Sequence, residues 1–105
     1  MGEEVGVYGT VAKMKLKPGA EDQLMQSMEG VQIPGHVATF VFKSDSDPNV
    51  HYVTTVFESS AAYKKFADSP AQDKRYQQMR ELLAADPEWH DGEVIYHDLK
   101  VEAAR

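Results

Sequence analysis

Cysteine is absent from this 105-residue sequence, so disulfide bonds, thiolate metal sites and thiol nucleophiles are excluded. Basic residues are scarce as well, because 11 Lys and Arg stand against 17 Asp and Glu and give a net charge of -6. Proteins that neutralise nucleic-acid phosphates or bind an anionic membrane surface need a basic face. We therefore expect no nucleic-acid partner and no membrane partner.

Long apolar segments are also missing. A membrane-spanning helix needs roughly 20 consecutive apolar residues, and the longest apolar runs here are far shorter. The N-terminal residues Met-Gly-Glu-Glu lack the basic region and apolar stretch of a signal peptide. Together with the lack of cysteine, these features predict a cytoplasmic protein. The length predicts a single domain, residues 1–105, with a core over roughly residues 7–101.

The first half of the chain predicts three strands and one helix. Residues 7–16 alternate in the manner of a strand. Residues 20–30 place apolar side chains on one stripe at helical spacing. Residues 36–43 and 50–58 are rich in Val, Thr, Tyr and Phe and are separated by a short polar turn. These two segments therefore predict an antiparallel hairpin.

The second half predicts a helix in two pieces and a final strand. Ser59 or Ser60 is suited to cap the first piece, and Ser69 before Pro70 begins a second piece that runs to about residue 85. A last strand is expected over about residues 92–101. The order β-α-β-β-α-β is that of the ferredoxin-like α+β fold, with helices on one face of a four-stranded antiparallel sheet.

The opposite face of this sheet is expected to be covered too. The second and third strands carry apolar side chains in both parities, for example Phe40 and Phe42 against Val37 and Val41. A sheet with one face in water alternates more cleanly between apolar and polar residues. A second copy of the sheet, related by a two-fold axis, is the simplest cover, and we predict a homodimer.

Four short motifs then suggest a family. They are Leu-Lys-Pro-Gly at 16–19, Ile-Pro-Gly at 33–35, Val-Phe-Glu-Ser-Ser at 56–60 and Ser-Pro at 69–70. In order and spacing they resemble the antibiotic-biosynthesis monooxygenase (ABM) superfamily over nearly the whole chain. The resemblance implies a dimeric α/β barrel whose final strand reaches across to the partner. It also implies a pocket in each subunit between sheet and helices.

The resemblance implies several activities, because the superfamily is diverse. Some members oxidise phenolic or anthrone-like compounds with molecular oxygen and no cofactor, some are quinol oxygenases, and some have no demonstrated activity. Others bind and degrade haem with an Asn, a Trp and a His, whose positions correspond to Ala12, Phe66 and Tyr76 here. Tyrosinate can ligate haem iron, but all three residues differ, so haem binding is the least favoured of these activities.

We therefore expect a cofactor-independent monooxygenase that acts on a small aromatic, phenolic or quinol-type substrate, with no cofactor and no metal. The main competing hypothesis is a non-catalytic dimeric barrel that binds a small hydrophobic ligand, and the less favoured one is a haem-binding protein. The expected catalytic residues are Tyr76, His51 and His90, because phenol and imidazole groups handle protons. No histidine pair has the i, i+4 spacing of a zinc site.

A set of aromatic and apolar side chains is expected to bind the substrate. Such side chains hold a flat aromatic ligand, and tyrosine hydroxyls can bond its oxygens, although each could equally be a core residue. Residues 88–92 are expected to form a loop, either a pocket rim or a loop anchored by a buried Trp. The expected substrate-binding residues are Tyr8, Tyr52, Tyr63, Phe66, Met79 and Trp89.

Overall fold

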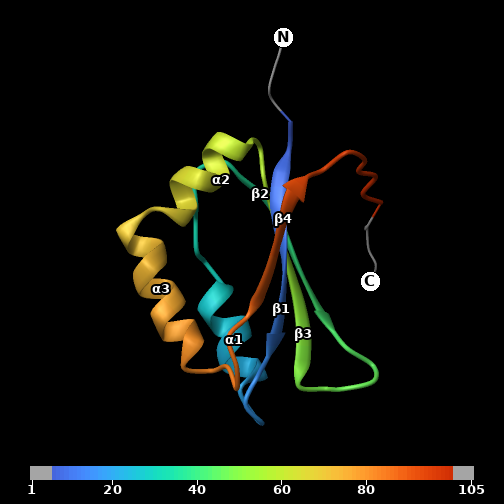
Figure 1. The fold of residues 1–105 in the computed structure, drawn as a ribbon, viewed down its shortest axis with the longest axis vertical. Coiled ribbons are helices and arrows are strands. Elements are labelled where there is room, and N and C mark those ends of the chain that lie inside the picture. The colour runs from blue at the N-terminus through green and yellow to red at the C-terminus, as the bar shows by residue number, and fades with distance from the viewer. Residues whose placement is uncertain (1–5, 101–105) are drawn as a thin grey trace.

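The computed structural model describes residues 6–100, and its element order confirms the predicted ferredoxin-like α+β fold (Figure 1). All strand pairs are antiparallel, and the order in the sheet is β2-β3-β1-β4. Among the described residues no helix is long and apolar enough to cross a membrane. The elements are β1 (Tyr8–Lys15), α1 (Glu21–Met28), β2 (His36–Lys43), β3 (Val50–Phe57), α2 (Ser60–Ala67), α3 (Pro70–Arg80) and β4 (Glu88–Glu93).

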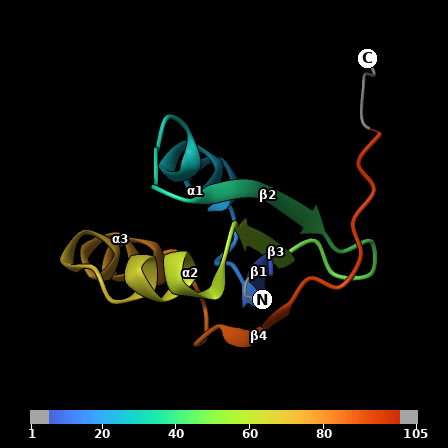
Figure 2. The same ribbon diagram turned by 90° about the horizontal axis from the view of Figure 1, so that it is seen from above.

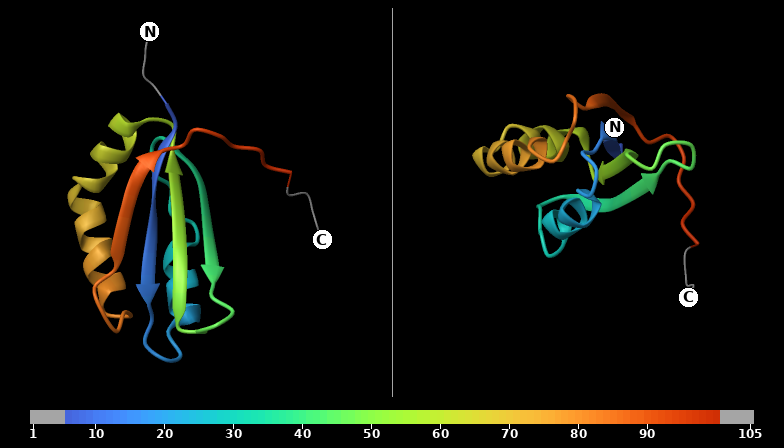
Figure 3. Two further views of the ribbon diagram at one scale, coloured as in Figure 1. Left: turned by 45° about the vertical axis from the view of Figure 1, so that its right-hand side comes forward. Right: turned by 90° about the horizontal axis from the view of Figure 1, so that it is seen from below.

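The three helices cover one face of the sheet. Seen from above, α1 lies on the β2 side of this face, and α2 and α3 lie on the β4 side (Figure 2). The opposite face carries Val11, Phe40 and Phe42, which are exposed large apolar side chains. Residues 94–100 leave the sheet on the side away from the helices (Figure 3). Within residues 6–100, the sheet is therefore covered on one face only.

The core under the helices has two parts. At one end an apolar cluster contains Ala12, Met14, Leu16, Ala20, Leu24, Val53 and Leu83. At the other end the buried Phe57 ring lies 4.9 Å from Phe66 and 5.6 Å from Tyr63, measured between ring centroids. Tyr8 extends this aromatic group, with its ring centroid 5.4 Å from that of Tyr63.

The two helical pieces begin where the sequence predicts. The Ser59 hydroxyl accepts a hydrogen bond from the Ala62 backbone N–H, and the Ser69 hydroxyl accepts one from Gln72. Pro70 occupies the first turn of α3, where its missing N–H removes no helical hydrogen bond. Each cap gives an acceptor to a backbone N–H that would otherwise have no partner. The two caps therefore fix where α2 and α3 begin.

The predicted end of the second piece is wrong, because α3 stops at Arg80 rather than near residue 85. The residues after Arg80 form backbone hydrogen bonds at the end of β1 and do not continue the helix. Lys17 N–H donates to the Leu82 carbonyl, and Ala84 N–H donates to the Lys15 carbonyl. Leu83 is thereby held as an isolated bridge opposite Leu16, and its side chain is buried. Tertiary pairing thus ends the helix before its apolar stripe ends.

The predicted last strand is also wrong in position. The strand β4 covers Glu88–Glu93, the segment expected as a loop, and residues 94–100 form no strand; residue 101 lies outside the described range. The pairing of β4 runs antiparallel along β1 and ends where Tyr8 faces Glu93. Since β1 begins at Tyr8, no strand remains opposite the residues beyond 93, although their apolar pattern resembles a strand.

Candidate functional site

A cavity of about 640 Å³ lies between the sheet and the helices. Its volume is in the range of small-molecule sites, about 300–1,000 Å³. The end of α1 and the loop after it form one wall with Met28, Val31 and Ile33. The helices α2 and α3 form the other wall with the apolar and aromatic side chains Tyr63, Phe66, Tyr76 and Met79.

The floor of the cavity contains a row of polar side chains that crosses all four strands. Thr39 on β2 faces Thr55 on β3, Thr55 faces Thr10 on β1, and Thr10 faces Asp91 on β4. All four residues line the cavity. This polar row (Thr39, Thr55, Thr10 and Asp91) places hydroxyl and carboxylate oxygens at regular intervals of about 4.8 Å, the spacing between neighbouring strands.

The next row of the sheet is apolar. It consists of Val41, Val53, Ala12 and Trp89, in the order of the strands. The Trp89 ring lies 6.3 Å from the Tyr76 ring between centroids, and the two planes are inclined by 50°. Trp89 is 45% exposed, so it does not serve as a buried loop anchor. A flat ligand that fits over the two rows would have polar atoms along the edge that faces the polar row and an apolar body over the apolar row.

One polar contact in the cavity joins α2 to β4. The Tyr63 hydroxyl donates to Asp91 Oδ1 at 3.1 Å. Burial, together with the nearby Asp91 charge, raises the pKa of Tyr63 to about 12, because both disfavour the phenolate. Tyr63 is therefore a donor, not a base, at neutral pH.

Thr10 is the buried member of the polar row. It is 6% exposed, and no hydrogen bond to its hydroxyl oxygen is formed within residues 6–100. The Thr10 hydroxyl approaches the Tyr63 phenol closely enough to oppose the rise of its pKa, but the contact does not meet the geometry of a hydrogen bond. Buried hydroxyls are usually hydrogen-bonded, so an unpaired one at a cavity wall is available to a ligand.

A guanidinium group lies at the rim formed by α3. Arg75 Nε donates to the Gln72 side-chain oxygen at 3.3 Å, and the guanidinium carbon lies 5.9 Å from the Phe66 ring centroid. These contacts hold Arg75 beside the apolar wall. Within the described residues no group of three or more His, Asp or Glu is placed to hold a metal ion.

The structure brings five of the predicted site residues together at the cavity. Tyr63, Phe66, Tyr76, Met79 and Trp89 all line it. They come from α2, α3 and β4. On each of the two helices the two residues share one face, because they are three residues apart, close to the helical period. Their roles in binding or catalysis stay predictions.

The other four predicted residues do not line the cavity. Tyr8 lies on the same face but packs against Tyr63. Tyr52 pairs with Lys13 and Phe42 on the opposite face, and His90 faces Val11 there. Tyr52 and His90 therefore lie on the face away from the cavity and not beside a ligand in it, because neighbouring residues of a strand point to opposite faces.

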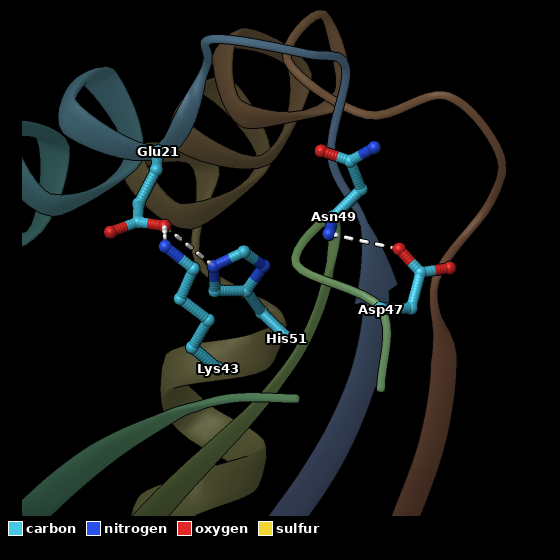
Figure 4. A network of polar contacts seen from close by, with 5 residues as sticks. All are labelled: Glu21, Lys43, Asp47, Asn49 and His51. Carbon is cyan, nitrogen blue, oxygen red and sulfur yellow. Dashed lines mark hydrogen bonds and ion pairs between the residues drawn. The ribbon is translucent and has the colours of Figure 1, made fainter. Parts of the chain in front are cut away.

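His51 is buried beside Glu21, at the start of α1, and is 1% exposed. Its Nε2 lies 3.2 Å from Glu21 Oε1, and Lys43 Nζ lies 3.0 Å from the same oxygen (Figure 4). Lys43 first, and then His51, hold the pKa of the Glu21 carboxyl below its usual value. In the hairpin turn, Asn49 N–H donates to Asp47. The His51 contact joins α1 to the β2–β3 hairpin, which is a structural arrangement.

The cavity residues that were not predicted include all four members of the polar row. No local motif marks them, because the three threonines stand on different strands and become neighbours only through the sheet register. Asp91 follows Trp89 by two residues, and this i, i+2 spacing in a strand was the one signal that placed both on one face.

Comparison with known proteins supports the same architecture. The sequence profile of the family Antibiotic biosynthesis monooxygenase matches residues 7–78. A protein of Chloroflexus aurantiacus classed with these monooxygenases is 26% identical, with a TM-score of 0.71 over 88% of this chain and 96% of that one. No curated protein sequence matches the chain.

Two more distant structures share the fold. One is a protein of Caulobacter crescentus from the same class, with 20% identity and a TM-score of 0.73 over 87% of this chain and 92% of that one. The other is SnoaB, a cofactor-independent oxygenase from Streptomyces nogalater, with 11% identity and a TM-score of 0.73 over 89% and 97% of the two chains.

Proposed function

Because the chain belongs to the antibiotic biosynthesis monooxygenase family, we propose that it oxidises a small aromatic, phenolic or quinol-type compound with molecular oxygen and without a cofactor. The observation that carries the proposal is the cavity, which combines apolar and aromatic walls with a polar row across its floor. Such a site suits a flat ligand with oxygen substituents along one edge. A cytoplasmic location belongs to the same proposal and is tested by cell fractionation.

The proposed reaction needs few chemical groups from the protein. Electron-rich phenolates and enolates react with oxygen directly once they are deprotonated, so the site needs to bind the substrate, stabilise its anion and exclude water. In this proposal the contacting rings of Trp89 and Tyr76 form a wall on which the substrate ring packs, and the Tyr76 hydroxyl contacts a substrate oxygen. Haem is not included, because Ala12 and Phe66 replace the Asn and Trp of the haem-degrading members and can form no side-chain hydrogen bond, which leaves only Tyr76 to contact the iron.

Oxygen consumption is the direct test. The purified protein is mixed with a panel of anthrones and dihydroxynaphthalenes, without added metal, flavin or haem. We expect uptake above the uncatalysed rate and a clear loss of rate for Tyr76→Phe. The matched control is Tyr96→Phe, because Tyr96 is 78% exposed in the segment after β4. Uptake that is equal in both variants would place the reaction outside this cavity.

A second candidate function is a barrel that binds such compounds without converting them. It is favoured by one observation: neither His51 nor His90, the histidines expected as bases, lines the cavity. The chain has a single tryptophan, so quenching of Trp89 fluorescence reports binding in this cavity alone. Saturable quenching with no oxygen uptake across the panel would support the binding protein over the enzyme.

We also propose that the functional unit is a homodimer formed through the open face of the sheet. Phe42 is 60% exposed on that face, and Ile95 is 90% exposed in the segment that leaves it. Large apolar side chains that are exposed together on one face are typical of an interface. Sedimentation should give twice the 11.7 kDa protomer mass. Phe42→Asp should shift the mass to one protomer, whereas Gln78→Asp, on the exposed face of α3, should not.

A further inference from the structure

We propose that Asp91 accepts the substrate's proton, that Tyr63 positions this carboxylate, and that the Thr10 hydroxyl binds the oxygen from which the proton leaves. The inference rests on the proposed function, because it assigns groups within the same cavity. It differs from the residues expected from the sequence, which were Tyr76, His51 and His90.

The carboxylate is fixed on one side and open on the other. Tyr63 donates to Oδ1 of Asp91 at 3.1 Å, and within residues 6–100 Oδ2 receives no side-chain hydrogen bond from a donor. The aromatic rings of Tyr8 and Phe57 pack against Tyr63. The phenol is therefore held in place, and it fixes the rotation of the carboxylate toward the cavity.

Thr10 supplies the independent observation that a ligand group belongs beside Asp91. The two residues face each other across β1 and β4, and the Thr10 hydroxyl is buried without a partner in the described chain. A ligand hydroxyl between them could give its proton to Asp91 and accept a hydrogen bond from Thr10. One ligand atom would then bond both the unpaired Thr10 hydroxyl and the open carboxylate oxygen.

The other ionisable groups at the cavity suit the role less well. Tyr63 stays protonated because its pKa is about 12, and Arg75 is a permanent cation. Asp73 also lines the cavity, but it bonds Gln77 of its own helix, whereas Asp91 faces the Thr10 hydroxyl across β1 and β4. His36 is the main rival, but its Nε2 contacts Thr39 at 2.7 Å, at the β2 end of the polar row. That position is two strands from Thr10, roughly 10 Å at the usual strand spacing.

The step is a simple proton transfer. The substrate O–H bond breaks, its electron pair stays on the oxygen, and the proton bonds to Asp91 Oδ2 to give a neutral carboxylic acid. The substrate anion then accepts the Thr10 hydrogen bond and is the species that reacts with oxygen in the proposed function. A carboxylate is a weaker base than a simple phenolate, so substrates with a delocalised, more acidic hydroxyl are favoured.

The first experiment uses a hydroxyanthraquinone, whose absorption moves to longer wavelength when its hydroxyl ionises. Quenching of Trp89 measures its binding, and the absorption band measures its ionisation. At a pH where the free probe is neutral, we expect wild-type protein to bind it as the anion. Asp91→Asn should bind the probe but leave it neutral, and Thr10→Val should lower the ionised fraction. Glu88→Gln is the matched control, because Glu88 is exposed on the other face of β4.

The second experiment is kinetic. Asp91→Asn should lower kcat by about 10²- to 10⁴-fold, the usual contribution of an acid–base group, with a small change in KM. Tyr63→Phe should lower kcat by roughly 10-fold, as expected for one hydrogen bond to a charged group. Thermal unfolding of each variant shows whether the fold is kept.

The results separate this inference from the proposed function. An ionised probe in wild type and a neutral one in Asp91→Asn, without oxygen uptake, would keep the proton acceptor and reject the oxygenase. An ionised probe that survives Asp91→Asn but is lost in His36→Gln would overturn the inference and leave the cavity as the binding site. No quenching of Trp89 by the probe would overturn both.

Discussion

Replacement of Gly35 by alanine tests how tightly the loop before β2 is packed against α2. Gly35 has a φ of 81°, and a Cβ there would lie 2.7 Å from the Ala62 Cβ. Gly19 has nearly the same φ, 82°, but a Cβ there would meet no atom within 4 Å. The two positions therefore share the backbone strain and differ in the steric contact, which makes Gly19→Ala the matched control.

The expected losses follow from these two terms. A left-handed backbone costs a residue with a Cβ about 1–2 kcal/mol, and overpacking at Ala62 adds about 1–3 kcal/mol. We expect Gly19→Ala to lower the free energy of unfolding by about 1–2 kcal/mol, and Gly35→Ala by about 2–5 kcal/mol. Since 1 kcal/mol corresponds to about 4–8 °C in a domain of this size, the melting temperatures should separate clearly.

Urea unfolding at one fixed protein concentration is the assay, because a dimer's stability depends on concentration. A double-mutant cycle with Ala62→Gly isolates the contact: the cycle with Gly35→Ala should show coupling of about 1–3 kcal/mol. The cycle with Gly19→Ala should show none. Equal losses for the two glycine variants, or no coupling at Ala62, would refute the packing argument.

Three further changes test the core, the ion network and a helix cap. Leu24 is fully buried, so Leu24→Ala should lower the free energy of unfolding by about 2–5 kcal/mol, with the urea midpoint falling at an unchanged slope. Lys43 and His51 lower the pKa of Glu21 below 4.5, so the stability that its charge provides is present above pH 4.5 and is lost as the pH falls through the lowered value. The melting temperature of Glu21→Gln should therefore lie below that of wild type at pH 7 and approach it at pH 3, and a constant difference would contradict this assignment. Ser69→Ala removes the cap of α3 and should cost about 1 kcal/mol, measured by thermal unfolding, whereas no change would show that Pro70 alone sets the helix start.

Local patterns were sufficient for most of the fold. The strands β2 and β3 begin and end within one residue of the predicted ranges, because β-rich segments and a polar turn are features of the sequence itself. The strand β4 was misplaced for the opposite reason. Its sequence Glu-Trp-His-Asp-Gly-Glu has no strand pattern, and it is a strand because the edge of β1 offers hydrogen-bonding partners.

The site residues show the same difference between local patterns and pairing between strands. Tyr63 and Tyr76 were expected to face the space between helices and sheet, since helical periodicity can be read along the chain, and both line the cavity. Tyr52 and His51 could not be assigned, because their strand carries apolar residues in both parities. The polar row depends on the register of three strand pairs. This register results from pairing between segments and cannot be read from the sequence of any one segment.

The acidic character of β4 has a consequence for solubility. In the described chain β4 pairs with β1 alone, so its outer edge presents unpaired backbone groups that could template the addition of a strand from another molecule. Three of its six residues, Glu88, Asp91 and Glu93, are acidic, and the whole strand is exposed. Stacking two such strands would bring like charges together, which opposes growth into fibrils at this edge. A chain engineered with neutral residues throughout β4 should therefore aggregate at concentrations that the natural sequence tolerates.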